Sequence, residues 1–116
     1  MEVKGIDYLC LGVADLERSK AFYMDVLGME TYAVEPAKVF LICGADILSL
    51  TWMPDASAAQ KVHFGFLIHT EHDMEEWKRQ LVAKGVAIER EERFATSWSI
   101  CFQDPDGHRI EMMHIF

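Results

Sequence analysis

The sequence predicts an α+β protein of two βαβββ modules, whose strands form a curved mixed sheet around a cleft and whose helices cover the outer face. Three observations lead to this prediction. The same order of strand-like and helix-like segments occurs twice, a glycine ends the helical stretch of each half, and a polar linker separates the halves. The predicted modules are residues 1–53 and 62–116, joined by a linker at 54–61 within a single domain, 1–116.

The first half begins with a predicted strand over residues 3–13. Asp15 can cap a helix that runs through Leu27, and Gly28 can end it, because glycine accepts the left-handed conformation found after helices. Apolar residues recur along this stretch at helical spacing. Three further strands are predicted at 31–34, 39–43 and 46–52.

The second half repeats this order. A strand is predicted at 62–69, and a capping-box-like sequence places the start of a helix at Asp73, with its end before Gly85. Asp104-Pro-Asp-Gly107 is typical of a tight turn. Further strands are predicted at 86–90, 98–102 and 108–115. We interpret the charged run 89–93 as a solvated strand end and loop.

Alternation along the strands separates packed side chains from those that face the cleft, because successive side chains of a strand point to opposite faces. Aligning the halves places Tyr8 over His63 and Ser49 over Glu111. Glu111 is a carboxylate in the middle of a terminal strand, and its parity puts it on the cleft side, where a charge can be used. The same parity predicts a cleft-facing set of Tyr8, Cys10, His63, Cys101, Arg109, Glu111 and Met113.

Composition excludes several classes of function. The chain has 116 residues, 51% of them hydrophobic, and a net charge of −8, which is the wrong sign for a nucleic-acid partner or an anionic membrane surface. The longest apolar run is too short to span a bilayer. Its three cysteines, Cys10, Cys43 and Cys101, are far apart and form no paired motif, so we expect reduced thiols and a cytoplasmic protein.

Two motifs carry a family resemblance. Val13-Ala-Asp-Leu-Glu-Arg-Ser-Lys-Ala-Phe-Tyr23 and the ending Asp104-Pro-Asp-Gly-His-Arg-Ile-Glu111 resemble the vicinal oxygen chelate superfamily. That group includes glyoxalase I, extradiol dioxygenases, fosfomycin-resistance proteins and bleomycin-resistance proteins. Within it, the second half is most similar to the thiol-transferring fosfomycin-resistance enzymes, through His63-Phe-Gly-Phe66 and the segments 73–77 and 99–108.

The resemblance implies a metal site. The fosfomycin-resistance enzymes hold a divalent metal with residues that correspond to Tyr8, His63 and Glu111, of which the histidine and the glutamate match. Ser49 stands where glyoxalase I has a further ligand. The implied cofactor is a divalent metal (Mn, Zn, Ni or Fe), with Tyr8 as a third ligand or as a catalytic acid or base. In the alternative, Tyr8, His63 and Glu111 bond to one another in a metal-free pocket.

The resulting expectation is a metal-assisted lyase or thiol transferase that acts on a small oxygenated substrate, with the metal as a Lewis acid. The alternative is a metal-free protein of the bleomycin-resistance type that binds a drug or metabolite, and a third interpretation is a dimeric scaffold whose site has decayed. A homodimer is expected by resemblance, with no nucleic-acid or membrane partner. The residues expected to contact the substrate are Cys10, Ser49, Cys101, Arg109 and Met113.

Overall fold

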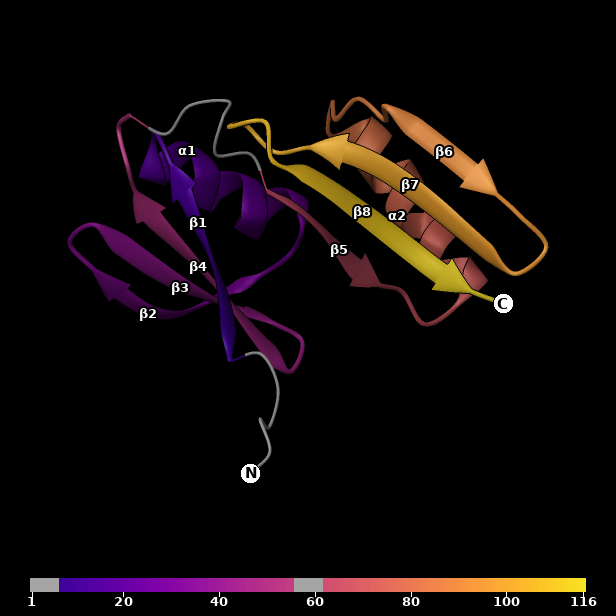
Figure 1. Cartoon of the computed structure of the whole chain (residues 1–116), viewed down its shortest axis with the longest axis horizontal. Helices are drawn as coiled ribbons and strands as arrows, with labels where there is room; N and C mark the ends of the chain where they lie inside the picture. The colour runs from indigo at the N-terminus through magenta and orange to yellow at the C-terminus, as the bar shows by residue number, and fades with distance from the viewer. Residues whose placement is uncertain (1–6, 56–61) are drawn as a thin grey trace. The chain divides into compact units, whose positions relative to one another are not determined.

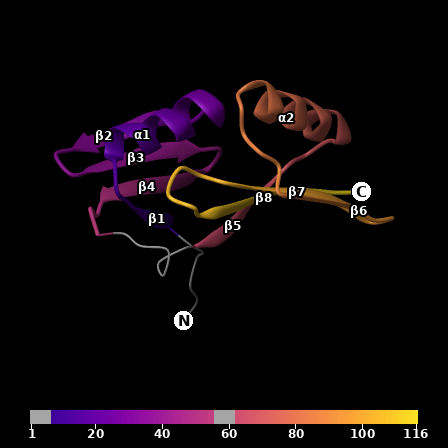
Figure 2. The ribbon, with the colours of Figure 1, turned by 90° about the horizontal axis from the view of Figure 1, so that it is seen from above.

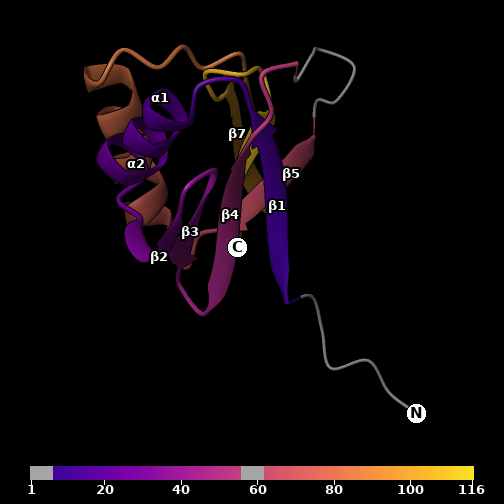
Figure 3. The same cartoon turned by 90° about the vertical axis from the view of Figure 1, so that its left-hand side faces the viewer.

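The structure is a computed structural model that describes residues 7–55 and 62–116. The chain divides into two compact units, residues 1–60 and 61–116, and each unit holds one four-stranded mixed sheet (Figure 1). Figures 2 and 3 show each helix on one side of the sheet of its own unit. The predicted α+β class and the repeated βαβββ order are confirmed. Parts of the predicted first strand (3–6) and linker (56–61) lie outside the described residues.

The first unit contains a parallel pair of strands followed by antiparallel neighbours, in the order β1-β4-β3-β2. β1 is parallel to β4, whereas β3 is antiparallel to both β4 and β2. Its elements are β1 (Tyr8–Val13), α1 (Leu16–Ala21), the π-helix η1 (Phe22–Val26), β2 (Glu30–Glu35), β3 (Lys38–Cys43) and β4 (Asp46–Trp52).

The second unit repeats this topology strand for strand, in the order β5-β8-β7-β6. β5 is parallel to β8, and β7 is antiparallel to both β8 and β6. Its elements are β5 (His63–Leu67), α2 (Glu71–Ala83), β6 (Arg90–Arg93), β7 (Ser97–Gln103) and β8 (Arg109–Ile115). No helix among the described residues is long and apolar enough to cross a membrane.

Alternating burial gives each sheet a packed face and an open face. In the second unit the packed face is built from large apolar side chains of β7 and β8 together with Met74 and Leu81 of α2. The strand residues of this face are Trp98, Ile100, Phe102, Ile110 and Met112, all buried. Burial of such side chains stabilises the fold by about 2 kcal/mol each. The residues between them therefore lie on the other side, which we call the open face.

The first helical segment has the predicted ends but not a uniform helical course. Asp15 caps it as predicted, since its carboxylate accepts the backbone N–H of Arg18 at 3.0 Å. From Phe22 onward the segment is a π-helix, which sequence periodicity does not reveal. Gly28 ends it as predicted: its φ is 73°, and the next amide, of Met29, bonds to the carbonyl of Tyr23 at 3.0 Å.

Two predicted boundaries in the second half are wrong. Helix α2 begins at Glu71, because Thr70 is the cap and its hydroxyl accepts the backbone N–H of Asp73 at 3.0 Å. The strand predicted at 86–90 is instead β6 at 90–93. The amide of Val86 bonds to the carbonyl of Leu81 at 2.9 Å, so this amide completes the helix end and is not available to a strand ladder.

Candidate functional site

A pocket of about 240 Å³ opens on the second unit and contains most of the side chains predicted for that half of the site. Its position follows from strand register. Glu111 of β8 pairs with Gly65 of β5 on one side and with Cys101 of β7 on the other. The pocket is lined by His63, Glu89, Arg90, Cys101, Arg109 and Glu111.

His63 and Glu111 come from neighbouring parallel strands and share the open face. His63 pairs with Arg109, and Glu111 lies two residues further along β8, which returns the side chain to the same face. Gly65, two residues after His63, lies close to the Glu111 backbone: a Cβ at that position would be 3.0 Å from the Glu111 carbonyl oxygen. The absence of a side chain at Gly65 leaves the space beside the carboxylate open.

Cys101 is a hydrogen-bond donor to Glu111. Its Sγ lies 3.6 Å from Glu111 Oε2, a contact between adjacent strands. Burial raises the pKa of the Cys101 thiol, and the negative charge of Glu111 raises it further. The thiol therefore stays protonated at neutral pH. In this form it is a weak nucleophile and a hydrogen-bond donor to the carboxylate.

Two pocket residues, Glu89 and Arg90, were not among the predicted site residues. The backbone N–H of Glu89 donates to the Cys101 carbonyl at 2.8 Å, and Arg90 pairs with Cys101 at the start of β6. Hydrophobic alternation does not extend across these charged residues, so their strand register was not evident from sequence. The pocket thus holds two arginines, Arg90 and Arg109, beside two carboxylates.

The first unit places its predicted site residues in the equivalent register. Tyr8 pairs with Ile47 and Cys10 with Ser49, so Ser49 is related to Tyr8 as Glu111 is related to His63. Tyr8 is 47% exposed, and the Cys10 thiol lies 3.2 Å from the Thr51 hydroxyl. The alignment of the two halves made from sequence is consistent with both registers.

Ser49 differs from Glu111 in its surroundings. It is fully buried, and its hydroxyl has no hydrogen-bond partner among the described residues. Lys38 lies over the aromatic rings of Tyr8 and Phe40, at 5.7 and 5.0 Å from their centroids. Around Ser49 the open face of the first unit thus has Lys38 and two aromatic rings, and Glu35, which pairs with Lys38, adds a carboxylate at the edge of the sheet. Contact of Cys10 or Ser49 with a substrate stays a prediction.

The second unit can supply two of the ligands that a divalent metal needs. Imidazole and carboxylate are suitable donors for Mn²⁺, Zn²⁺, Ni²⁺ and Fe²⁺, and catalytic sites commonly use three protein ligands. Within 7–55 and 62–116, no three His, Cys, Asp or Glu side chains converge as one ion would require. His63 and Glu111 therefore fit a metal as part of a ligand set, and a third ligand from Tyr8 stays a prediction.

The turn before Arg109 is held by a buried polar cluster. Asp104 accepts the backbone N–H groups of Asp106 and His108 at 3.0 and 2.9 Å, and its other oxygen lies 2.8 Å from His108 Nδ1. Both Asp104 and His108 are buried. The cluster fixes where β8 begins, and so where Arg109 enters the pocket.

Asp104→Ala is expected to lower the free energy of unfolding by about 3 kcal/mol, because it leaves buried donors without an acceptor. Urea denaturation followed by circular dichroism measures this. Asp46→Ala, at an exposed position at the start of β4, is the control and should change stability by less than about 0.5 kcal/mol. If Asp104→Ala lost as little stability as the control is expected to lose, the buried cluster would not contribute to stability.

The repeated βαβββ modules define the class. The chain belongs to the Glyoxalase/Bleomycin resistance protein/Dioxygenase superfamily, which it matches over residues 5–112. The predicted resemblance to the vicinal oxygen chelate superfamily is confirmed.

Similar proteins include two named as thiol transferases, FosA and FosB. The chain is 27% identical to the glutathione transferase FosA of Serratia marcescens over 115 residues, which are 95% of this chain and 80% of FosA. It is 30% identical to the metallothiol transferase FosB of Staphylococcus epidermidis over 118 residues, covering 97% of this chain and 82% of FosB. The likeness extends over both modules.

Solved structures share the fold. Lactoylglutathione lyase from Agrobacterium tumefaciens superposes with a TM-score of 0.85 and 28% identity, covering 97% of this chain and 95% of the lyase. FosX from Listeria monocytogenes also reaches 0.85, at 21% identity, covering 99% of this chain and 96% of FosX, and supports the fold alone.

Proposed function

We propose that the chain is a divalent-metal-assisted enzyme, a thiol transferase or a lyase, that acts on a small oxygenated substrate. The observation that carries this proposal is the pair His63 and Glu111, an imidazole and a carboxylate on the same face of adjacent strands and in one pocket. Glu111 is half-buried in the middle of β8, and taking an ionised group partly out of water is costly unless the group is used or paired.

In this proposal His63 and Glu111 hold the metal, and Tyr8 is a third ligand or an acid–base group. A bound Mn, Zn, Ni or Fe ion would supply Lewis acidity toward substrate oxygens. Arg109 and Arg90 would bind an anionic group of the substrate, since guanidinium groups recognise planar and tetrahedral oxyanions well. Cys101 would orient Glu111 through its thiol, and Met113 would provide apolar contact.

The names of the relatives favour a thiol transferase among these reactions. FosA is named a glutathione transferase and FosB a metallothiol transferase, and both align over nearly the whole chain. The lyase remains the second reaction type, because a lactoylglutathione lyase has the same fold at similar identity. Family membership alone does not fix the reaction, because one fold hosts many activities.

A metal-free binding protein is the second candidate function. It is favoured by the Cys101 thiol, which satisfies Glu111 without a metal, and by the two-ligand set of the second unit. In that case the pocket would bind a drug or metabolite through its arginines, and Met113, which shares the open face with Glu111 but lies outside the pocket lining, would supply apolar contact. With either function, we propose that the protein is a homodimer in the cytoplasm.

Elemental analysis of protein purified without a histidine tag or chelator tests the proposal, together with calorimetric titration of Mn²⁺ and Zn²⁺. We expect about one ion per chain, or uptake at micromolar concentrations. Thiol consumption with epoxide substrates would then be measured with and without the metal. Absence of metal after purification, with no uptake on titration, would contradict the enzyme and favour the binding protein, for which thermal-shift screening of ligands is the next measurement.

A further inference from the structure

β6 presents one of the two pocket arginines from the edge of the second sheet. Arg90 pairs with Cys101 and therefore shares the open face with Glu111. Its Nε lies 3.0 Å from Glu92, the next residue of β6 on that face. β6 has four residues and bonds to a single neighbour, β7, in its sheet. A short strand with one neighbour opens locally more easily than a central strand, so Arg90 needs a further restraint to keep its place.

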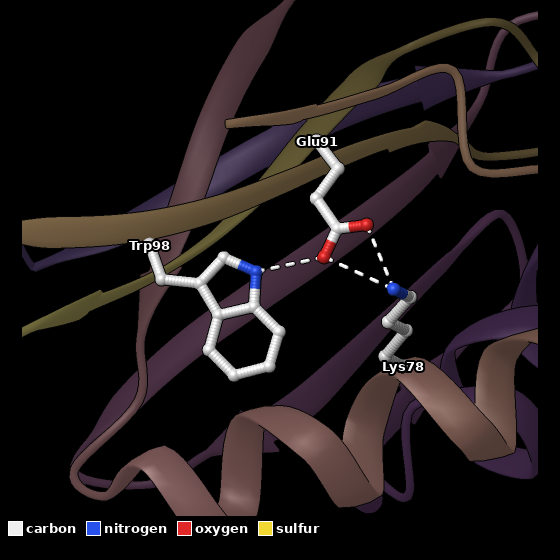
Figure 4. Close-up of polar contacts among 3 residues, drawn as sticks. All are labelled: Lys78, Glu91 and Trp98. Carbon is white, nitrogen blue, oxygen red and sulfur yellow. Dashed lines mark hydrogen bonds and ion pairs between the residues drawn. The ribbon is translucent and has the colours of Figure 1, made fainter. Parts of the chain in front are cut away.

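Glu91 provides such a restraint on the opposite face of β6. Its carboxylate accepts two bonds from Lys78 Nζ of α2, at 2.7 and 3.1 Å, and one from Trp98 Nε1 of β7, at 2.9 Å (Figure 4). Charge-assisted bonds of this length are stronger than neutral ones. The hydrogen bond from Lys78 holds the pKa of Glu91 below its ordinary value, so the carboxylate is ionised at neutral pH.

The two partners of Glu91 belong to packed elements, and the Lys78 side chain itself is 42% exposed. Lys78 lies between Met74 and Leu81 on α2, and both of these side chains are fully buried. Trp98 is almost fully buried, and the guanidinium of Arg93 lies 4.4 Å from its ring centroid. The Glu91 carboxylate thus connects the edge strand to a packed helix and to a core tryptophan.

We infer that Glu91 is a positioning residue: its bonds to Lys78 and Trp98 hold β6 in place, and thereby hold Arg90 at the wall of the pocket. The inference rests on the proposed function in one respect, namely that Arg90 meets an anionic group of the substrate. Adjacent residues of a strand point to opposite faces. The contacts of Glu91 therefore restrain Arg90 through the backbone of β6, and Glu91 itself does not touch the ligand.

Arg109 provides an internal comparison. It lines the same pocket, but it lies on β8, which has β5 and β7 as neighbours on its two sides. Its strand does not depend on Glu91 for its position. Loss of the Glu91 contacts should therefore disturb Arg90 and leave Arg109 unchanged.

The first measurement follows the side chains directly and needs neither metal nor substrate. The Nε–H signals of Arg90 and Arg109 are observed by ¹⁵N NMR and assigned with Arg90→Lys and Arg109→Lys. Glu91→Gln, which keeps an acceptor for Trp98 but loses the charge that binds Lys78, should shift and broaden the Arg90 signal only. Lys78→Met should do the same. Glu75→Gln, on the same helix, is the charge-matched control. An unchanged Arg90 signal in both variants would overturn the inference.

The second measurement uses methylphosphonate as an oxyanion probe in the presence of Zn²⁺. Glu91→Gln should weaken its binding about tenfold and leave the affinity for Zn²⁺ unchanged. In an Arg90→Ala background the same substitution should have no further effect, whereas in an Arg109→Ala background its full effect should persist. Equal losses in both backgrounds would contradict positioning through Arg90. If the wild type does not bind methylphosphonate, the anion site of the proposed function fails, and the NMR signals still decide the role of Glu91.

Discussion

Glu111→Gln is expected to abolish metal uptake while the protein stays folded. Structural zinc sites with four ligands bind with roughly 10–16 kcal/mol, so one ligand contributes about 3 kcal/mol, or roughly a hundredfold in affinity. The loss should be at least this large, since His63 would be the one proposed ligand left in the second unit. The amide is close to isosteric and can still accept the Cys101 thiol, which contacts Glu111 at 3.6 Å. Titration calorimetry with Zn²⁺ and Mn²⁺ measures the change.

Glu89→Gln is the matched control for this variant. Glu89 is a carboxylate in the same pocket, yet no three acidic, histidine or cysteine side chains of the described chain converge on one point. Its substitution changes the charge of the pocket by the same amount as Glu111→Gln. Metal affinity should therefore fall in the Glu111 variant alone. A similar fall in both would indicate a general electrostatic effect, and an unchanged affinity in Glu111→Gln would remove Glu111 from the ligand set.

Much of the fold was predictable from sequence because its signals are local and repeated. Asp15 and Gly28 mark the ends of the first helical stretch through backbone chemistry that the structure shows directly. The period-two burial of Trp98, Ile100 and Phe102 fixed which side of β7 is packed. Since neighbouring strands share their faces, this one alternation also placed Cys101 and Glu111 on the open face.

The misplaced elements have a common physical cause, which is competition between local signals. Thr70 and Asp73 both have side chains suited to capping, and the hydroxyl of Thr70 takes that role by accepting the Asp73 amide. Val86 has a strand-forming side chain, but its amide is used by the helix end. β6 has four charged residues and no alternation of apolar and polar side chains, so its register with β7 is not evident from the sequence.

The two units show how one topology carries two kinds of chemistry. The strand orders are the same, and Tyr8 and Ser49 occupy the registers that His63 and Glu111 occupy in the second unit. The equivalent registers therefore hold a phenol and a hydroxyl in the first unit, and an imidazole and a carboxylate, which are better metal donors, in the second. This equivalence makes position 8 the place where one added ligand should have the greatest effect.

Tyr8→His is expected to raise the affinity for Mn²⁺, Ni²⁺ or Zn²⁺ well over tenfold. A phenol must lose its proton before it binds a metal strongly, whereas a neutral imidazole binds without that cost, and each added ligand contributes binding energy on the kcal/mol scale. Tyr8 is exposed on the open face of the first sheet, so an imidazole at this position would be accessible. Calorimetric titration of the variant and of the wild type gives the change in affinity.

Tyr32→His is the matched control, because Tyr32 is a tyrosine of the same unit that is 67% exposed on β2. A gain in Tyr8→His that is absent in Tyr32→His would place position 8 among the ligands, and Glu111→Gln in the same chain should then cancel the gain. Equal gains in the two tyrosine variants would mean that any surface histidine binds these metals. No gain in Tyr8→His would remove Tyr8 from the proposed ligand set, and the third ligand would then have to be sought elsewhere, with Cys101 as the pocket residue to substitute next.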